Sequence, residues 1–340
     1  MNILVTGGAG YIGSHTVVEL LEKGYQPIIA DDLSNSRDSV IKAIHEITGK
    51  KVPFLKVDLC NKKETENIFN LYKIDATIHF AAWKAVGESV VEPLKYYRNN
   101  LLSLINILEI YKERKLNNFV FSSSCSVYGQ ADKLPVTENT PLKKPESPYG
   151  NSKQIGEEII EDAINANNFN GIALRYFNPA GAHASALIGE FPLQPPTNLV
   201  PVITQTAIGK RKSVIVHGNN YNTPDGTCIR DYIHVVDVAK AHIAAIERLL
   251  NQKNTKSFEI YNLGSGKGNS VLEAIKTFEK VSGNKLNYSI GPRRSGDVEK
   301  VWADTSLANN ELGWKCGFDL EDIMRSAWEW ELKLNDRISV

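Results

Sequence analysis

The first half of the chain alternates short apolar runs with longer stretches of helical spacing. The apolar runs occupy 2–6, 26–30, 52–57, 76–80, 119–122 and 172–176, and their length is typical of buried strands. The clearest helix is predicted from apolar residues that recur every three or four positions: Leu94, Tyr97, Leu101, Leu104, Ile105, Leu108 and Tyr111. Strands that alternate with helices predict an α/β fold with a parallel, doubly wound sheet.

This alternation breaks after residue 177. The segment 191–196 is rich in proline and predicts a loop, while helices are expected from about 199 to 209 and from about 235 to 251. Short apolar runs at 214–217 and 258–263 predict further strands. We therefore expect one domain at 1–177 and a smaller α/β domain at 178–340, with parts of 230–263 packing back on the first.

A glycine-rich turn joins the first predicted strand to the first predicted helix. Gly7, Gly10 and Gly13 permit a tight turn, close approach of a pyrophosphate and close packing of helix on strand, and the helix N-terminus then faces the phosphates. The second strand ends in Asp31 and Asp32, and a carboxylate there can hold a ribose hydroxyl but repels a 2′-phosphate. The turn therefore predicts a Rossmann-type dinucleotide site that prefers NAD to NADP.

Several candidate site residues directly follow predicted strands. In a parallel sheet the carboxyl ends of the strands meet at one edge, and ligands bind there. The residues in this position are Gly10, Asp31, Asp58, Ala81, Ser124 and Asn178. We therefore expect them to lie together along one edge of the sheet, with Asp58 and Leu59 near an adenine.

A tyrosine and a lysine four residues apart are the candidates for proton transfer. Ser147 suits a helix N-cap and Pro148 the first helical position, so Tyr149 and Lys153 are predicted to share one helix face. A phenol has a pKa near ~10, and lowering it to the ~7 that suits a general base requires roughly 4 kcal/mol. One ammonium about 4 Å away supplies about that amount at an effective dielectric near 20. We therefore expect Lys153 to lower the pKa of Tyr149, although a surface pair would show the same spacing.

Composition argues against several other classes of protein. The chain has 340 residues, and its 39 basic and 39 acidic side chains cancel, so no overall charge attracts nucleic acid or an anionic membrane. The four cysteines show no metal-binding spacing, so we expect neither disulfides nor a metal site. The N-terminus has no basic lead or long apolar run, and no stretch is long enough to span a bilayer, so we expect a cytoplasmic protein.

Taken together, the motifs resemble the extended short-chain dehydrogenase/reductase family, and within it the UDP-glucose (UDP-galactose) 4-epimerases. The resemblance is carried by TGGAGYIGSH at 6–15, KAVGES at 84–89, FSSS at 121–124, SPY at 147–149, RYFNP at 175–179, RDYIHV at 230–235 and YNLG at 261–264. It runs from the first residue to about Trp330.

The resemblance implies an isomerase that oxidises C4 of a UDP-hexose transiently with bound NAD. Tyr149 would take the proton from the 4-hydroxyl, Ser124 would bind the 4-oxygen, and Lys153 would lower the tyrosine pKa and bind the nicotinamide ribose. NAD contacts would fall on Gly7, Gly10, Tyr11, Ile12, Asp31, Asp32, Asp58, Leu59, Phe80, Ala81, Lys84, Asn99, Tyr149, Lys153 and Phe177. The UDP-sugar would contact Lys84, Ser124, Tyr149, Asn178, Asn198, Leu199, His217, Arg230, Arg294, Asp297 and Val301. The domain at 1–177 would then bind NAD, the domain at 178–340 would bind the UDP-sugar, and two copies would form a homodimer.

Two positions narrow the reaction and the sugar. Relatives that dehydrate or decarboxylate nucleotide sugars carry an acid after the serine or threonine, whereas this chain has Cys125 and Ser126, which favours epimerisation. Val301 stands where some members place a tyrosine, so we expect room for UDP-GlcNAc and UDP-GalNAc as well. The alternatives are a related dehydratase, decarboxylase or reductase, or a non-catalytic dinucleotide sensor, which would not need the serine, tyrosine and lysine together.

Overall fold

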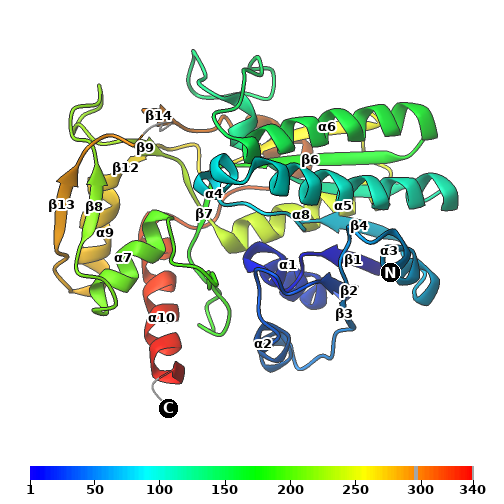
Figure 1. Ribbon diagram of the computed structural model, residues 1–340, viewed down its shortest axis with the longest axis horizontal. Coiled ribbons are helices and arrows are strands. Elements are labelled where there is room, and N and C mark those ends of the chain that lie inside the picture. The colour runs from blue at the N-terminus through cyan, green and yellow to red at the C-terminus, as the bar shows by residue number, and fades with distance from the viewer. Residues whose placement is uncertain (295–297, 339–340) are drawn as a thin grey trace.

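The main element of the protein is a seven-stranded parallel sheet. The structure is a computed structural model and describes residues 1–294 and 298–338. The strand order is β11-β6-β5-β4-β1-β2-β3, and every neighbouring pair is parallel. Figure 1 labels β1, β2, β3, β4 and β6 of this sheet. The strands are β1 (Asn2–Thr6), β2 (Gln26–Asp31), β3 (Phe54–Lys56), β4 (Ala76–His79), β5 (Asn118–Ser124), β6 (Asn170–Tyr176) and β11 (Phe258–Leu263). The predicted α/β fold with a Rossmann-type, doubly wound sheet is confirmed.

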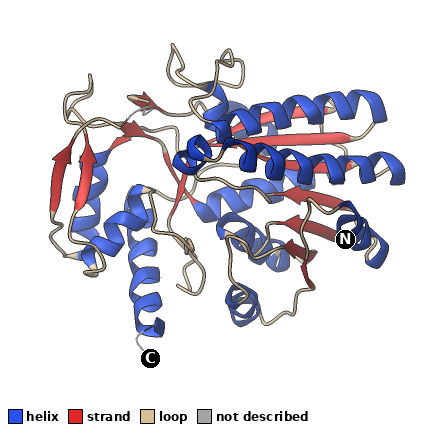
Figure 2. Ribbon diagram, viewed as in Figure 1, coloured by secondary structure: helices blue, strands red, loops and turns tan. Residues whose placement is uncertain are grey.

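Helices cover both faces of this sheet (Figure 2). One face carries α1 (Tyr11–Glu22), α2 (Ser39–Thr48) and α8 (Val235–Leu250), and the other carries α3 (Lys62–Leu71), α5 (Pro93–Arg114) and α6 (Pro148–Asn167). β1 shows why such a strand reads as one apolar run, because Ile3 and Val5 pack into the first core and Leu4 into the second. None of the helices in the described parts of the chain combines the length and apolar character that a membrane crossing requires.

The residues after 177, apart from α8 and β11, form a second region. This second region contains three small sheets and its own apolar core. β7 (Asn178–Ala180) pairs with β10 (Tyr232–His234), β8 (Val214–His217) with β13 (Tyr288–Gly291), and β9 (Ile229–Arg230) with both β12 (Asn269–Ser270) and β14 (Lys300–Val301). Side chains of α7 (Leu199–Ala207), α9 (Val271–Ser282) and α10 (Leu320–Ile338) contribute to the core. The chain returns to the main sheet through α8 and β11, whereas the domain boundary after residue 177 stays a prediction.

Several elements of the structure are absent from the sequence-based prediction. They include α2, α9, α10, the short helices α4 (Val86–Val91) and η1 (Cys125–Tyr128), the turn η2 (Ala308–Leu312) and most short strands of the second region. For α9 a signal was available, because Ser270 and Glu273 form a capping box in which each side chain accepts a hydrogen bond from the other residue's backbone N–H. The missed strands are two to four residues long, which is too short for a periodic pattern to show.

Candidate active site

The glycine turn between β1 and α1 is shaped to receive a phosphate chain. Gly7 has a φ of +67°, and a Cβ on it would lie 2.8 Å from the backbone nitrogen of Ala81. A Cβ on Gly13 would lie 2.3 Å from the Gly7 carbonyl oxygen, so neither position admits a side chain. α1 begins after Gly10, and no side chain caps its first backbone N–H groups. The turn and the helix N-terminus therefore fit the pyrophosphate of NAD.

Asp31 stands at the end of β2 and holds the loops on both sides of it. Its carboxylate accepts hydrogen bonds from Ala9 N at 3.0 Å, Leu33 N at 2.9 Å and Ser36 Oγ at 2.8 Å. Burial raises the pKa of this carboxyl, and the three hydrogen bonds oppose that increase. Asp31 thus ties the glycine turn to the loop after β2, and the exposed Asp32 lies beside it.

The other predicted cofactor residues border the same edge of the sheet. Phe80 and Ala81 follow β4, and their backbone nitrogens donate to the carbonyl and the hydroxyl of Thr6 at 3.1 and 3.3 Å. The remaining ones are Tyr11 and Ile12 in the first turn of α1, Asp58 and Leu59 after β3, Asn99 on α5 and Phe177 directly after β6. The structure therefore brings the predicted cofactor side together where the strands end.

Two of the predicted residues also contact the second region. The Tyr11 hydroxyl donates to the carbonyl oxygen of Gly181 at 2.6 Å, and Lys84 Nζ lies 3.3 Å from Glu190 Oε1. The same Glu190 oxygen accepts a hydrogen bond from Asn198 Nδ2 at 2.7 Å, and Asn198 is the N-cap residue of α7. Glu190 therefore connects a predicted cofactor residue to a predicted sugar-nucleotide residue, and sequence analysis did not single it out.

Ser124, Tyr149 and Lys153 meet where β5 ends and α6 begins. The Ser147 hydroxyl caps α6 as predicted, so Tyr149 lies in the first turn and Lys153 one turn later. The Ser124 hydroxyl lies beside Tyr149 and lowers its pKa, and its oxygen accepts hydrogen bonds from Ser126 N at 3.2 Å and Ser126 Oγ at 2.9 Å. Lys153 Nζ donates to the carbonyl oxygen of Ser122 at 2.6 Å. The arrangement places a phenol, a hydroxyl and an amine at one end of the sheet.

The predicted effect of Lys153 on Tyr149 differs from what the structure shows. Burial raises the pKa of Tyr149 to about 12, and the neighbouring Ser124 hydroxyl only partly opposes this. Lys153 is itself buried, which lowers the pKa of its amine to about 7, while Glu157 opposes that decrease. The prediction included the attraction between the two groups and left out the cost of burying each of them.

On the sugar-nucleotide side, one group of predicted residues is enclosed. Asn178 begins β7, and its side-chain oxygen is buried without a hydrogen-bond partner among the described residues, so it can accept a hydrogen bond from a ligand. Val301 on β14 pairs with Arg230 on β9 and is 9% exposed. It packs in an apolar cluster with Phe177 and Tyr128. These residues therefore line the boundary between the two regions.

The other predicted sugar-nucleotide residues are spread more widely. His217 ends β8 and Arg294 follows β13, and both are exposed. Leu199 opens α7, and Asp297 lies outside the described residues. No group of three or more His, Cys, Asp and Glu side chains in residues 1–294 and 298–338 is arranged to hold a metal ion.

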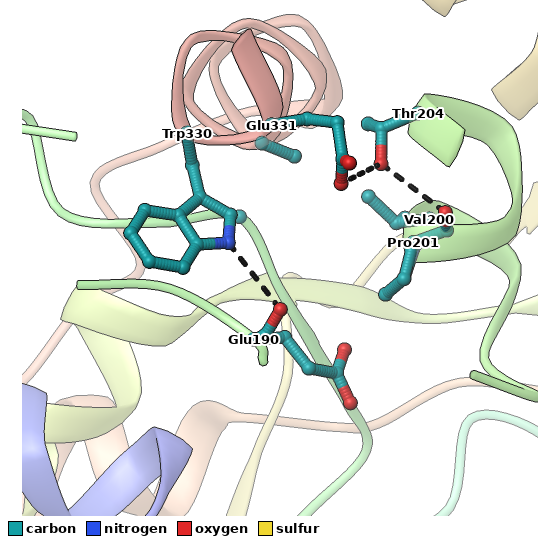
Figure 3. A pocket seen from close by; sticks show the side chains of 8 residues that line it. Glu190, Val200, Pro201, Thr204, Trp330 and Glu331 are labelled. Carbon is teal, nitrogen blue, oxygen red and sulfur yellow. Dashed lines mark hydrogen bonds between the residues drawn. The ribbon is translucent and has the colours of Figure 1, made fainter. Parts of the chain in front are cut away.

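A small cavity beside Glu190 is separate from this chemistry. Its volume is about 10 Å³, which suits about one water molecule. Figure 3 shows Trp330 Nε1 donating to the Glu190 carbonyl oxygen and the Thr204 hydroxyl donating to Glu331, at 3.3 Å each. None of the predicted catalytic or cofactor residues lines the cavity, so it is not the reaction site.

Known proteins share both the sequence and the fold of this chain. The family model described as GDP-mannose 4,6 dehydratase matches residues 4–327. A UDP-glucose 4-epimerase from Dictyostelium discoideum is 49% identical over 330 residues, which are 97% of this chain and 95% of that protein. The UDP-glucose 4-epimerase from Homo sapiens is 48% identical over 336 residues, with 97% and 96% covered. The chain belongs to the UDP-glucose 4-epimerase family.

A solved structure of the same family matches along nearly the whole chain. The UDP-glucose 4-epimerase from Bifidobacterium longum, in complex with NAD+ and UDP, has a TM-score of 0.95 and 44% sequence identity and covers 99% of each chain. The predicted family is therefore confirmed. Within the UDP-glucose 4-epimerase family, Cys125 is consistent with the absence of an eliminating acid, because burial raises the pKa of its thiol to about 12.

Asn100 is a supporting residue of this epimerase that sequence analysis missed. Its Oδ1 accepts a hydrogen bond from Trp83 N at 2.8 Å, and its Nδ2 donates to the Trp83 carbonyl at 3.0 Å and to Ser152 Oγ at 3.1 Å. It therefore joins the loop before Lys84 to α6. Asn100 lies four residues before Leu104, so a polar side chain on the buried face of a predicted helix was the available signal.

Proposed function

We propose that this protein interconverts UDP-glucose and UDP-galactose by oxidising C4 of the hexose and returning the hydride to the opposite face of the ring. The chain is an NAD-dependent UDP-hexose 4-epimerase, an isomerase, by its membership of the family. The observation that carries the reaction is that the pair of Ser124 and Tyr149 lies, with Lys153, at the sheet edge that also bears the glycine turn. A non-catalytic dinucleotide sensor would have no use for that pair.

Tyr149 is the proposed general base, which takes the proton of the 4-hydroxyl and returns it after the sugar has turned. The Ser124 hydroxyl, which lies beside Tyr149, is proposed to hydrogen-bond to both the Tyr149 hydroxyl and the 4-oxygen of the sugar. Bound NAD+ supplies the hydride acceptor and a positively charged ring. Since burial raises the pKa of Tyr149 to about 12, we expect its proton to leave only where cations and hydrogen-bond donors surround it, and Lys153 is the protein's own cation there.

The UDP-sugar is proposed to bind between the two regions. Arg230 and Arg294 would bind the diphosphate, since a planar guanidinium contacts two phosphate oxygens at once. The Asn178 side-chain oxygen would accept a hydrogen bond from a sugar hydroxyl. The remaining proposed contacts are those of Lys84, Asn198, Leu199, His217, Asp297 and Val301.

The experiment that tests the function offers the purified protein UDP-galactose, with and without added NAD. We expect UDP-glucose to form until the two sugars reach equilibrium, with no net accumulation of NADH. Separation of the sugar nucleotides measures the product. Net consumption or formation of NADH would indicate a reductase or dehydrogenase, and formation of a stable dehydrated sugar would indicate a dehydratase.

We also propose that N-acetylated UDP-sugars enter the same site. Val301 is small, and it lies at the boundary between the regions beside Phe177 and Tyr128. A tyrosine ring at this position would occupy volume that an N-acetyl group could use. The expected substrates are therefore UDP-GlcNAc and UDP-GalNAc in addition to the plain hexoses.

A cytoplasmic homodimer is proposed as the working form. The four cysteines are free, which suits a reducing compartment. On α5, Leu94 is 80% exposed and Ile105 is 36% exposed, and Leu101 lies between them on the same stripe. An exposed apolar stripe on a long helix favours packing against a second copy. Light scattering should show twice the monomer mass, and a monomer at all concentrations would contradict this.

A further inference from the structure

We propose that Glu157 and Arg175 are a positioning pair for the reaction, which holds α6 against β5 and β6 so that Tyr149 and Lys153 face Ser124. The proposal deepens the proposed function and rests on it. Neither residue is among those predicted to touch the cofactor or the sugar. Their role would be exerted through the helix that carries the base.

The contacts of Glu157 join one helix to two strands. Arg175 Nε lies 2.9 and 3.2 Å from the two Glu157 carboxylate oxygens, and Arg175 Nη2 donates to one of them as well. The Ser123 hydroxyl donates to the same carboxylate. Glu157 and Arg175 are 4% and 3% exposed. Two hydrogen-bonded charges so deeply buried fix the distance between the elements that bear them.

The place of the pair in the fold connects it to the reacting groups. Ser123 and Arg175 are register partners on β5 and β6, and the next residue on β5 is Ser124. On α6, Tyr149, Lys153 and Glu157 follow one another at intervals of four residues and so lie on one face. Glu157 therefore anchors α6 about two turns from Tyr149, on the same helix face. Its partner on β5 is Ser123, the residue next to Ser124.

Arg175 extends the anchor to the other side of the site. Its Nη1 donates to the Tyr128 hydroxyl at 2.9 Å, and the Tyr128 hydroxyl donates to Asn262 Oδ1 at 2.7 Å. Tyr128 ends η1, the short helix that follows Ser124. The pair therefore orients both elements that flank the Ser124 hydroxyl, which are α6 and η1.

The same pair supplies charge balance for Lys153. The Lys153 amine donates to a backbone carbonyl, and Glu157 is the carboxylate that favours its protonated form. The titratable groups that face Lys153 and Tyr149 from other elements are His79 on β4, Cys125 on η1, Tyr96 on α5 and Tyr176 on β6. Tyr128 on η1 and the carboxyl of Glu138 face Arg175. The pKa shifts of His79, Cys125, Tyr96 and Tyr176 favour their neutral forms, and burial likewise raises the pKa of Glu138. Glu157 is therefore the charged group on α6 that acts most directly on Lys153.

A second arginine–glutamate pair gives a matched control. Arg248 Nε lies 2.6 Å from Glu259 Oε2 and Arg248 Nη2 lies 3.0 Å from Glu259 Oε1, and both side chains are less than a tenth exposed. This pair joins α8 to β11 and touches none of the proposed catalytic residues. Arg248 also pairs with Glu311, whose Oε2 lies 2.9 Å from Arg248 Nη2. The two buried pairs therefore resemble each other in chemistry and burial and differ chiefly in their proximity to the reaction.

The experiment compares Glu157→Gln with Glu259→Gln in the full-length protein, using wild-type conversion of UDP-galactose as the reference. Both variants should lose thermal stability, because Glu157→Gln removes the buried carboxylate that pairs with Arg175, and Glu259→Gln removes the buried one of the two carboxylates that pair with Arg248. Only Glu157→Gln should lower kcat, by at least tenfold, and move the pH profile of kcat to lower pH. The pH shift is expected because removing a negative charge favours both the tyrosinate and the neutral lysine.

The outcomes separate this proposal from the proposed function. If wild type does not epimerise UDP-galactose, the function fails. With an active wild type, the positioning role is overturned if Glu157→Gln keeps its kcat within twofold of wild type and its pH profile unchanged. It is also overturned if Glu259→Gln loses as much kcat as Glu157→Gln. Should Glu157→Gln fail to fold, the test variant is Arg175→Lys, which keeps the positive charge but loses the bidentate contact with the Glu157 carboxylate. We then expect kcat to fall at least fivefold, and an unchanged kcat would overturn the proposal.

Discussion

The proposed cofactor side and the proposed sugar side of the active site are built in different ways. On the cofactor side, Asp31 ends β2 and Phe177 directly follows β6 of one continuous sheet, and they are 8% and 5% exposed. On the sugar side, Asn198 and His217 stand at the ends of short elements and are exposed. The register of the hydrogen-bonded sheet fixes the positions of the residues on the cofactor side relative to one another. The residues on the sugar side depend on contacts between segments far apart in the chain.

Asp231 is one of the side chains that hold the segments of the proposed sugar side together. Its carboxylate is fully buried and accepts hydrogen bonds from Ser265 N at 2.7 Å, Gly266 N at 3.2 Å and Ala303 N at 3.0 Å. One side chain, directly before β10, therefore joins its own segment to the loop after β11 and to the segment that follows Val301. Substitutions on the two sides should accordingly differ in whether they change stability, turnover or only substrate binding.

The largest effect is expected at the junction of the two sides, from Tyr149→Phe. The substitution removes only the hydroxyl, so the sheet edge and the cofactor site should keep their structure. Loss of a general base lowers turnover by roughly 10²–10⁴-fold. Measurement of kcat with UDP-galactose tests the expected loss of turnover, and the NAD content of the purified protein tests whether the cofactor site is preserved. Turnover within tenfold of wild type would remove Tyr149 from the mechanism.

On the buried side, Lys153→Met should change how stability depends on pH. Burial lowers the pKa of the Lys153 amine to about 7 in the folded protein, against ~10.4 in the unfolded chain, so the unfolded chain binds more protons between these values. The free energy of unfolding of the wild type should therefore rise between pH 7 and about 10, by a few kcal/mol, and the variant should lack this rise. Denaturant unfolding across that range measures the two slopes, and equal slopes would contradict the assignment.

On the enclosed part of the sugar side, Val301→Tyr should sharpen sugar selection. The ring would fill space beside Phe177, and overpacking of this kind costs about 1–3 kcal/mol. We expect kcat/KM for UDP-GalNAc to fall at least tenfold, with a much smaller change for UDP-galactose. The idea is wrong if both proteins treat UDP-GalNAc alike or if wild type ignores it.

The smallest effect is expected from His217→Ala, on the exposed part of the sugar side. The side chain is exposed and lies at the end of β8, so the free energy of unfolding should stay within about 0.5 kcal/mol of wild type. Loss of a substrate contact should raise KM for UDP-galactose a few-fold and leave kcat unchanged. A large loss of stability would mean that His217 supports the fold instead.

The same contrast explains what could be predicted from the sequence. The strands of the main sheet and the cap at Ser147 were predictable because buried parallel strands read as apolar runs and helix starts depend on local residues. The raised pKa of Tyr149 was not, because desolvation depends on what the rest of the chain places around it. Partners such as Glu157 and Arg175 meet only in the folded sheet, and no local spacing relates them.

The central claim is that the hydrogen at C4 leaves as a hydride and returns from the bound cofactor. The most direct test supplies UDP-galactose that carries deuterium at C4 and determines the position of the label in the UDP-glucose product by NMR. The account predicts that the deuterium remains at C4 after its configuration has inverted. A product whose C4 hydrogen comes from the solvent would contradict the account.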